Sequence, residues 1–254
     1  MPEAVPAVVL AGGTRPEVMA RHYGLAHKAL VPVAGVPLVQ RVMAALQAAR
    51  QAEPVALATC REEVAALAPP GVIVARPSGT HFVDTITAGL AAVSRPERIL
   101  VCTCDLPLLT PEAVDDFVGR ALDTGADLCY SMVNGQRLRE LPVLAHRTLV
   151  RLREGRYTGG NLALLSRRLI EEKAPRLGQA FAGRKNQLAL AWMLGPGFVW
   201  RLATGRLGLA EIVAKARELL DLSAAVIDST YVEVCYDIDK PRHVALAEAI
   251  LAQR

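Results

Sequence analysis

The order of hydrophobic and polar positions predicts alternating strands and helices over the first half of the chain. Short runs that are apolar at nearly every position are typical of buried strands, and they cover residues 5–10, 54–59, 71–75, 98–104 and 126–133. Segments with apolar residues at helical spacing lie between them, at residues 37–50, at residues 82–93 and after Thr110-Pro111-Glu112. This alternation predicts an α/β fold of three layers, with a mostly parallel central sheet and helices on both faces.

The pattern changes over residues 134–222. This middle part combines several helical patterns with a predicted turn at residues 157–161 and a glycine-proline break at residues 195–197. Strand character returns at residues 224–235, and residues 243–252 predict a closing helix. The chain therefore consists of a regular framework, an elaborated middle part and a short closing part.

The composition is that of a folded chain. Of the 254 residues 52% are hydrophobic and 21% are charged, so the low hydrophobicity and high charge of disordered chains are missing. No apolar run reaches the roughly 18 residues of a membrane span, and no basic region precedes the first apolar stretch, so we expect neither a membrane segment nor a secretory signal. The five cysteines form no CxxC pair, which favours reduced thiols and a cytoplasmic location.

Two adjacent glycines follow the first predicted strand, in Leu10-Ala11-Gly12-Gly13. Glycines let the backbone approach a ligand closely, and successive N–H groups form a concavity that binds anions. A tight turn explains the same residues. Lys28 ends the following loop, where it either reaches phosphates held by the glycines or is a solvated surface lysine.

Aspartates follow two other predicted strands. Asp105 comes after the buried run 98–104, at the sheet edge where parallel α/β folds bind ligands. Thr110 already serves as the N-cap of the next helix, so a magnesium ligand is the favoured use of Asp105. Asp237 and Asp239 are two residues apart, so an extended chain turns both to one side, although either one alone could cap the last helix. Carboxylates from separate strand ends make a site of hard oxygens that suits Mg²⁺ with phosphate.

Four segments, in this order, resemble the motifs of one group of enzymes. The glycine loop and residues 28–38 are similar to the opening of nucleotidyltransferases with the nucleotide-diphospho-sugar transferase fold. Residues 85–90 resemble their SVxxGL helix, residues 101–110 their strand that ends in an aspartate, and residues 237–241 their closing DIDTPED motif. Within this group the chain resembles the MobA-like NTP transferase family, and the resemblance implies a Rossmann-like fold.

The resemblance implies where the nucleotide binds. The triphosphate would lie on the glycine loop, and the base and ribose beside the segment before the residue 82–93 helix. The expected contacts are Leu10, Ala11, Gly12, Gly13, Arg15, Lys28, Ser78, Gly79 and Thr85. The loop departs from the family pattern after its second glycine, and Arg21 is an alternative to Arg15 as the loop arginine.

The resemblance also implies the catalytic residues and the cofactor. Lys28, Asp105 and Asp239 would carry catalysis, and Asp105 and Asp239 would hold Mg²⁺. Asp237 is the alternative to Asp239 as the second metal ligand. The closing motif departs from the family pattern at residues 242–243, where Arg and His replace an acidic pair.

The acceptor site is expected in the middle part. Its candidate residues, which a structural turn and surface charge explain equally well, are Gly159, Gly160, Asn161, Arg184 and Lys185. The net charge of +4 is too small to indicate nucleic-acid binding. Residues 134–222, however, carry 16 basic and 7 acidic side chains, a net charge of +9. An anionic acceptor and an arginine-rich solvated face are equal explanations of this excess.

The implied activity is Mg²⁺-dependent transfer of an NMP from an NTP to an anionic, phosphorylated acceptor, with release of pyrophosphate. We expect one nucleotidyltransferase domain over residues 1–254. Residues 1–133 would bind the NTP, residues 134–222 would form the acceptor side, and residues 223–254 would supply a strand, a metal-binding aspartate and the last helix. The expected partners are the NTP and a small anionic acceptor, without membrane or nucleic acid, and a homodimer is left open.

Two other functions fit the same residues. A glycosyltransferase on this fold usually carries Asp-x-Asp after the central strand, where this chain has the single aspartate of Cys104-Asp105-Leu106-Pro107. A non-catalytic nucleotide-binding regulatory module would bind Mg²⁺ and NTP without releasing pyrophosphate.

Overall fold

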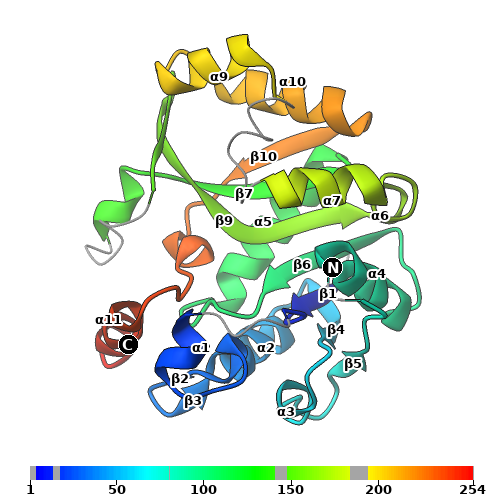
Figure 1. Cartoon of the computed structure of the whole chain (residues 1–254), viewed down its shortest axis with the longest axis vertical. Coiled ribbons are helices and arrows are strands. Elements are labelled where there is room, and N and C mark those ends of the chain that lie inside the picture. The colour runs from blue at the N-terminus through cyan, green and yellow to red at the C-terminus, as the bar shows by residue number, and fades with distance from the viewer. Residues whose placement is uncertain (1–3, 14–17, 80, 141–147, 184–193, 254) are drawn as a thin grey trace.

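A central sheet of eight strands organises the molecule (Figure 1). The computed structural model describes residues 4–13, 18–79, 81–140, 148–183 and 194–253. In spatial order the strands are β10 (Ala224–Asp228), β7 (Leu128–Asn134), β9 (Gly155–Ser166), β6 (Arg98–Thr103), β1 (Val5–Leu10), β4 (Ala52–Ala58) and β5 (Ile73–Ala75), with β8 (Val150–Leu152) paired to β9. A separate hairpin consists of β2 (Pro32–Val33) and β3 (Val36–Pro37).

The sheet is mostly parallel, as the sequence pattern predicts. β1 pairs in parallel with β4 and with β6, β4 pairs in parallel with β5, and β7 pairs in parallel with β10. β9 alone runs against both of its long neighbours, β6 and β7. The carboxyl ends of β1 and β6 therefore meet at one edge of the sheet, and the loops that follow them lie side by side.

Helices cover both faces of the sheet, which confirms the predicted three layers. Side chains of alternate strand residues point to opposite faces, so Val9 belongs to one core and Val8 to the other. The helices that pack on the Val9 face are α2 (Leu38–Ala48), α5 (Pro111–Thr124) and α11 (Pro241–Leu251). Those on the Val8 face are α4 (Phe82–Ala92), α6 (Arg167–Glu172) and α7 (Ala174–Gly183).

The remaining elements lie around this sandwich. They are the helices α1 (Val18–His22), α3 (Glu62–Ala65), α9 (Pro196–Ala203) and α10 (Leu209–Leu220), and the 3₁₀ turns η1 (Lys28–Leu30), η2 (Arg137–Glu140) and η4 (Val232–Cys235). α9 and α10 lie at the top of Figure 1, above β10, whereas α11 lies at the lower left. Within the described part of the chain, no helix is long and apolar enough to cross a membrane.

Gly89 brings α4 close to the central strand. A Cβ on Gly89 would lie 2.3 Å from Cγ1 of Val8 on β1, so a larger residue here would push the helix off the sheet. This close contact gives a packing reason for the glycine of the SVxxGL-like segment. It also fixes the N-terminal turn of α4 beside the glycine loop that follows β1.

The predicted turn at residues 157–161 is wrong, because these residues lie inside β9. The two glycines are required by close neighbours on β7 rather than by a turn. A Cβ on Gly159 would lie 2.7 Å from the hydroxyl of Tyr130, and one on Gly160 would lie 2.2 Å from Oγ of Ser131. The register between β7 and β9 also shifts at this point, so the glycines mark an irregular ladder.

The predicted closing strand at residues 224–235 is only partly correct. β10 ends at Asp228, and Val232–Cys235 form the 3₁₀ turn η4. Oγ of Ser229 accepts a hydrogen bond from the Tyr231 N–H at 3.1 Å, a local serine turn that competes with strand continuation. The aspartates of the closing motif therefore follow a 3₁₀ turn and not a strand of the sheet.

Candidate active site

Three carboxylates gather at the edge of the sheet where β6 ends. Asp105 comes two residues after β6 and is 5% exposed, whereas Asp237 and Asp239 arrive from the segment after η4. The backbone N–H of Ile238 donates to the Asp105 carbonyl at 3.1 Å, and this bond fixes the closing segment against the β6 loop. One carboxylate oxygen from each aspartate lies within 4.8 Å of the others.

Lys28 lies between two of these carboxylates. Its Nζ is 2.6 Å from Oδ2 of Asp105 and 3.3 Å from Oδ1 of Asp239. The lysine belongs to η1, whose start is capped by Nδ1 of His27, which accepts from the Ala29 N–H at 3.1 Å. The Lys28 side chain is 12% exposed, so this ion pair is largely shielded from water. A buried carboxylate requires such a partner, and Lys28 provides it.

The oxygen set fits a divalent cation. Oδ1 of Asp105 is buried and has no hydrogen-bond partner among the described residues. Asp237 and Asp239 add two more carboxylates, and no cysteine or histidine belongs to the cluster. Hard carboxylate oxygens of this kind are the ligands that Mg²⁺ prefers, with its remaining positions left for water and phosphate. Asp105, Asp237 and Asp239 are therefore the residues that could hold a magnesium ion.

The glycine loop lies against α4. Gly12 is buried, and a Cβ at this position would lie 2.2 Å from Oγ1 of Thr85. Thr85 is itself 3% exposed, and its hydroxyl donates to the His81 carbonyl at 3.2 Å. Thr85 therefore packs against the buried side of the loop at Gly12, whereas Gly13 is exposed to solvent.

The loop is also held from the β4 side. The Ala11 N–H donates to the Ala58 carbonyl at 2.9 Å, and the Thr59 hydroxyl donates to the Ala11 carbonyl at 2.9 Å. The Cys60 thiol lies 3.5 Å from the carbonyl of Gly12. With these contacts the backbone path from Leu10 to Gly12 is fixed before any ligand arrives.

Ser78 and Gly79 lie just before α4. Ser78 is exposed. Gly79 has no side chain, and this leaves room for the Asp84 carboxylate: a Cβ on Gly79 would lie 2.2 Å from an oxygen of Asp84. That carboxylate accepts the His81 N–H at 2.9 Å and so caps the helix. The structure thus brings the Ser78-Gly79 segment and the glycine loop to the same N-terminal turn of α4.

Of the predicted acceptor residues, Asn161 reaches the carboxylate cluster. Its Nδ2 lies 3.3 Å from Oδ1 of Asp237 and 3.5 Å from the Val234 carbonyl. Gly159 and Gly160 are packed against β7, and the Tyr130 hydroxyl donates to the Gly160 carbonyl at 2.7 Å. Three predicted site residues lie outside the described residues: Arg15, Arg184 and Lys185. Arg21, the alternative loop arginine, is exposed in α1.

His243 is a residue of the site that sequence reasoning did not select. Its Nδ1 accepts the Asp239 N–H at 3.3 Å, and burial lowers the pKa of its imidazole, which favours this neutral, accepting form. The Tyr236 hydroxyl donates to the His243 carbonyl at 2.8 Å, and burial raises the pKa of Tyr236 to about 12. The sequence did contain a signal for His243. Arg and His stand at residues 242–243 where the family has an acidic pair, so a histidine follows Asp239 by four residues.

The Cys102 thiol, near the end of β6, is not activated as a nucleophile. Burial, followed by the nearby charge of Asp105, raises the pKa of the Cys102 thiol well above its ordinary value. The thiol is protonated at neutral pH, and only thiolates are strong nucleophiles. All five cysteines are free, and Cys60 is the exposed member of the set.

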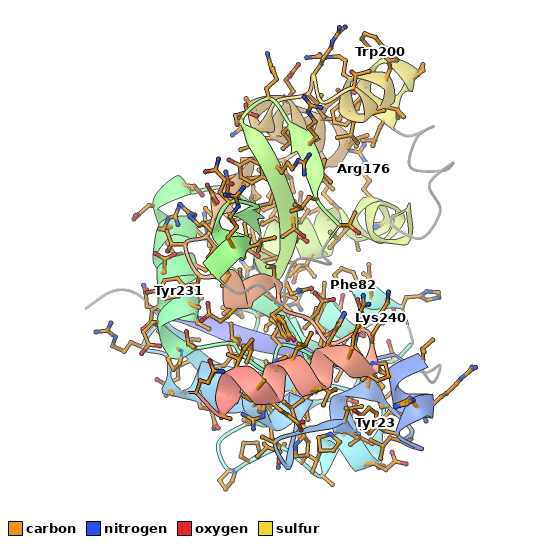
Figure 2. All side chains as sticks on the ribbon, turned by 90° about the vertical axis from the view of Figure 1, so that its left-hand side faces the viewer. Tyr23, Phe82, Arg176, Trp200, Tyr231 and Lys240 are labelled. Atoms are coloured by element: carbon orange, nitrogen blue, oxygen red, sulfur yellow. The ribbon has the colours of Figure 1, made fainter. Side chains whose placement is uncertain are left out.

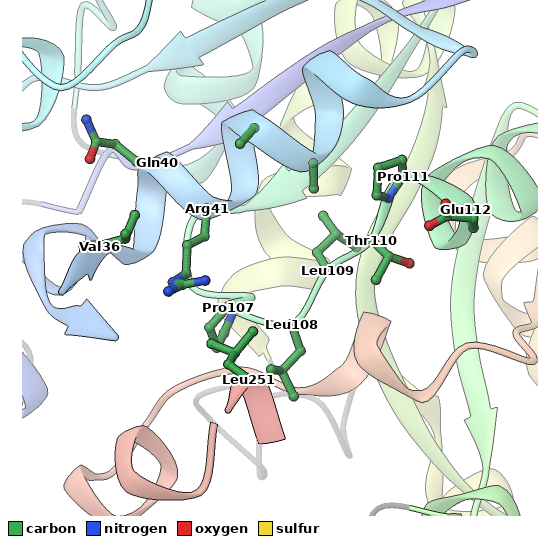
Figure 3. A pocket seen from close by; sticks show the side chains of 12 residues that line it. Val36, Gln40, Arg41, Pro107, Leu108, Leu109, Thr110, Pro111, Glu112 and Leu251 are labelled. Carbon is green, nitrogen blue, oxygen red and sulfur yellow. The ribbon is translucent and has the colours of Figure 1, made fainter. Parts of the chain in front are cut away.

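A pocket of about 440 Å³ lies close to the Asp105 loop but does not contain the carboxylates (Figure 3). Arg41 of α2 faces the Pro107–Leu109 backbone across it, and Leu251 of α11 closes one side. The Arg41 guanidinium is engaged, because its Nε and Nη2 donate to the Val33 carbonyl at 2.9 and 2.7 Å. The pocket therefore lies between α2 and the Asp105 loop, and its lining does not include Lys28 or the three aspartates.

Comparison with known proteins finds relatives of this chain in sequence and in structure. A family model described as a MobA-like NTP transferase domain matches residues 7–179, which include the glycine loop, Lys28 and Asp105. Among solved structures, a hypothetical transferase from Thermus thermophilus is 35% identical with a TM-score of 0.79, and the match covers 95% of this chain and 99% of that one. No curated protein matches the chain.

Two more distant structures share the fold. One is CMP:2-keto-3-deoxy-manno-octonic acid synthetase complexed with CTP, at 14% identity and a TM-score of 0.62, covering 99% of both chains. The other is 4-diphosphocytidyl-2C-methyl-D-erythritol synthase from Anaerococcus prevotii, at 12% identity and a TM-score of 0.58, covering 99% of this chain and 97% of that one.

Proposed function

This chain belongs to the MobA-like NTP transferase family and is a nucleotidyltransferase, and we propose that it moves an NMP from an NTP to an anionic acceptor with release of pyrophosphate. The observation that carries the proposal is the position of Lys28 among Asp105, Asp237 and Asp239, beside a fixed glycine loop. A triphosphate needs cations and N–H donors, and a divalent metal needs carboxylates. Both sets are present at one edge of the sheet.

The glycine loop and Lys28 bind the triphosphate. The exposed Gly13 offers a backbone N–H donor, and the Lys28 ammonium is a point charge on a flexible four-carbon stem. Ser78 and Gly79 stand at the N-terminal turn of α4, where they border the nucleoside. Because the loop is fixed by Thr85, Thr59 and Cys60, little ordering remains to be done on binding.

The reaction is an in-line substitution at phosphorus. An anionic oxygen of the acceptor forms a bond to the α-phosphorus as the bond to the bridging α–β oxygen breaks, and pyrophosphate leaves with that bond pair. Asp105, with Asp239 or Asp237, would hold Mg²⁺, which when bound neutralises charge on the phosphate oxygens. No enzyme nucleophile takes part, so the chain contributes positioning and charge.

An anionic acceptor is supported by two arginines on the hairpin of β8 and β9. Arg151 and Arg156 are exposed and lie directly opposite each other in the pairing of β8 with β9. Two like charges in this position repel each other and destabilise the strand pair. Arg153 and Arg201 both pair with Glu211, whereas neither Arg151 nor Arg156 pairs with a carboxylate of the described residues. A phosphate or carboxylate held between the two guanidinium groups relieves this repulsion.

The geometry of β9 connects these arginines to the reaction site. Arg156 lies five residues before Asn161, about 16 Å along an extended strand, and Asn161 contacts Asp237. The aliphatic part of the Arg151 side chain packs against Gly205: a Cβ added to Gly205 would lie 2.8 Å from Cδ of Arg151. An acceptor that lies along β9 would thus place its reactive group near Asn161 and a distal anionic group between the arginines.

The test is a screen of the common NTPs against pooled phosphorylated acceptors, with Mg²⁺ and a pyrophosphate readout. We expect pyrophosphate release with at least one pair, and its loss in Asp105→Asn. Asp123→Asn, an exposed aspartate of α5, is the matched control and should retain activity. Release of a nucleoside diphosphate from a nucleotide sugar, without pyrophosphate, would make the protein a glycosyltransferase. Binding of NTP and metal without turnover would make it a regulatory module.

A further inference from the structure

We propose that the Lys28 ammonium takes the place of the divalent cation in the ligand-free protein, so that the site accepts the cation together with a nucleotide and binds it poorly alone. The inference rests on the proposed function for the identity of the nucleotide. The proposal concerns the order in which the nucleotide and the cation bind. The catalytic roles proposed above for Lys28 and the aspartates do not fix that order.

The contacts of Lys28 carry the argument. Nζ lies 2.6 Å from Oδ2 of Asp105 and 3.3 Å from Oδ1 of Asp239, and both residues belong to the carboxylate cluster. The ammonium thus occupies the space between two carboxylates that could each ligate a metal. Oδ1 of Asp105 is buried and the residue is 5% exposed, so this carboxylate offers a metal little open surface while Lys28 is in place.

Charge then decides the order of binding. A divalent cation that joins the carboxylates while Lys28 remains would bring like charges close together at Asp105, where the Lys28 and Asp105 side chains are largely shielded from water, at 12% and 7% exposed. If the cation instead displaced Lys28 without a new partner for the lysine, the ammonium, whose side chain is 12% exposed, would lose its carboxylate, which is unfavourable for a largely buried charge. A triphosphate solves both problems, because its oxygens receive the ammonium while the cation replaces it at Asp105. The flexible lysine stem permits this exchange.

A second consequence concerns the ligand-free protein. With Lys28 in place, Asp105 is compensated and the closing segment is held to it, both through Asp239 and through the Ile238 N–H. Lys28 is then an internal counter-ion that keeps the site assembled between turnovers. Removing its charge should make the free protein depend on a divalent cation for stability.

The test measures binding of Mn²⁺ alone, by electron paramagnetic resonance, to the nucleotide-free protein. The variants are Lys28→Met and, as a control, Lys240→Met, which removes a lysine charge next to Asp239 from an exposed position (Figure 2). We expect Lys28→Met to bind Mn²⁺ at least about tenfold more tightly than the wild type. Lys240→Met should stay close to the wild type. Equal affinity of Lys28→Met and wild type would overturn the proposal, as would an equal gain in Lys240→Met.

Thermal unfolding gives a second readout on the same variants. We expect Lys28→Met to unfold at a lower temperature than the wild type in EDTA and to recover on addition of Mn²⁺; a variant that folds only with Mn²⁺ supports the proposal in the same way. If Lys28→Met folds under neither condition, nitrogen-15 NMR of the wild-type lysine ammonium groups decides. The Lys28 signal should move when Mg²⁺ and a non-hydrolysable NTP are added together and stay in place with Mg²⁺ alone at the same concentration. A signal that responds equally to Mg²⁺ alone contradicts the proposal.

These outcomes are separate from those of the proposed function. If the wild type releases pyrophosphate but Lys28→Met gains no affinity for Mn²⁺, only the exchange of cations fails. If no NTP and acceptor pair reacts but Lys28→Met gains affinity, the proposed reaction fails and the role of Lys28 as counter-ion stands.

Discussion

The nucleotide edge and the arginine arm of this molecule are built in opposite ways. The nucleotide edge consists of the glycine loop, Thr85, Lys28 and Asp105. Gly12, Thr85 and Asp105 are buried, and several short contacts hold this edge together. The arginine arm consists of β8, residues 155–158 of β9, α9 and α10. No residue of α9 is buried, and Trp200 is 55% exposed at the end of the arm (Figure 2).

Under the proposed function, this difference matches a different ligand to each region. A triphosphate with its metal has the same shape and charge in every NTP, so a rigid, pre-formed edge suits it. Few buried apolar contacts give a region low local stability and freedom to adjust. The arm has a small core around Met132, Leu152, Tyr157 and Leu207, and its surface carries exposed arginines. An acceptor specific to this protein would be selected there.

The largest effect is expected from Asp105→Asn. The change keeps the size of the side chain but removes the charge that a metal and Lys28 both require. We expect kcat for nucleotidyl transfer to fall at least about a hundredfold, because charge stabilisation at the reacting phosphate is lost. Steady-state kinetics with a pyrophosphate readout measures it. Activity of Asp105→Asn equal to that of the Asp123→Asn control would remove Asp105 from the site.

The next largest effect is expected from Lys28→Met on nucleotide affinity. Without the ammonium, the triphosphate loses a charge-assisted hydrogen bond, and we expect the Kd for the NTP to rise about tenfold or more. Calorimetric titration of the NTP with Mg²⁺ measures it, and Lys240→Met is again the matched control. An unchanged Kd in Lys28→Met would show that another cation holds the phosphates.

A smaller effect is expected from Gly12→Ala, and it tests how tightly the nucleotide edge is packed. The new Cβ would lie 2.2 Å from Oγ1 of Thr85, so the free energy of unfolding should fall by about 1–3 kcal/mol. Gly13→Ala meets only Nε2 of His27, at 3.5 Å, and should cost less.

Denaturant unfolding measures both glycine variants. Adding Thr85→Ala to Gly12→Ala should restore part of the lost stability, because it removes the atoms in conflict. Equal losses in Gly12→Ala and Gly13→Ala, with no restoration, would mean that the loop does not rest on Thr85.

The smallest effect is expected from Arg156→Gln on the arginine arm. Loss of one exposed guanidinium should raise KM for the acceptor by about three- to tenfold and leave KM for the NTP unchanged. Arg176→Gln, which removes another exposed arginine from an element outside the β8–β9 hairpin, α7, serves as control (Figure 2 labels Arg176). A change in KM for the NTP, or an equal effect of both variants, would contradict the assignment of the arm to the acceptor.

The same two regions differ in how well their sequence predicts their structure. At the nucleotide edge, two glycines follow the buried strand β1 and Asp105 follows the buried strand β6. Because these strands are parallel neighbours, their carboxyl ends lie side by side. The predicted strands at residues 5–10 and 98–104 correspond to β1 and β6 within one residue. The proximity of Gly12 and Asp105 therefore follows from local pattern and a general rule of folds.

On β9, by contrast, the local pattern misleads. Gly159 and Gly160 have the composition of a turn, but they lie in a strand because Tyr130 and Ser131 of β7 occupy the space of their side chains. A single sequence does not contain this pairing between segments 30 residues apart. The contact of Asn161 with Asp237 and that of His243 with Asp239 depend on such pairings, so the full site was not predictable from the chain alone.

The most direct test of the account is diffraction from crystals grown with Mn²⁺ and a non-hydrolysable NTP. The account predicts an anomalous peak for Mn²⁺ bonded to Asp105 and to Asp239 or Asp237, with the triphosphate on Gly12 and Gly13 and Lys28 turned to the phosphates. An ordered nucleotide whose metal lies away from Asp105, or one with Lys28 still between the carboxylates, would contradict it.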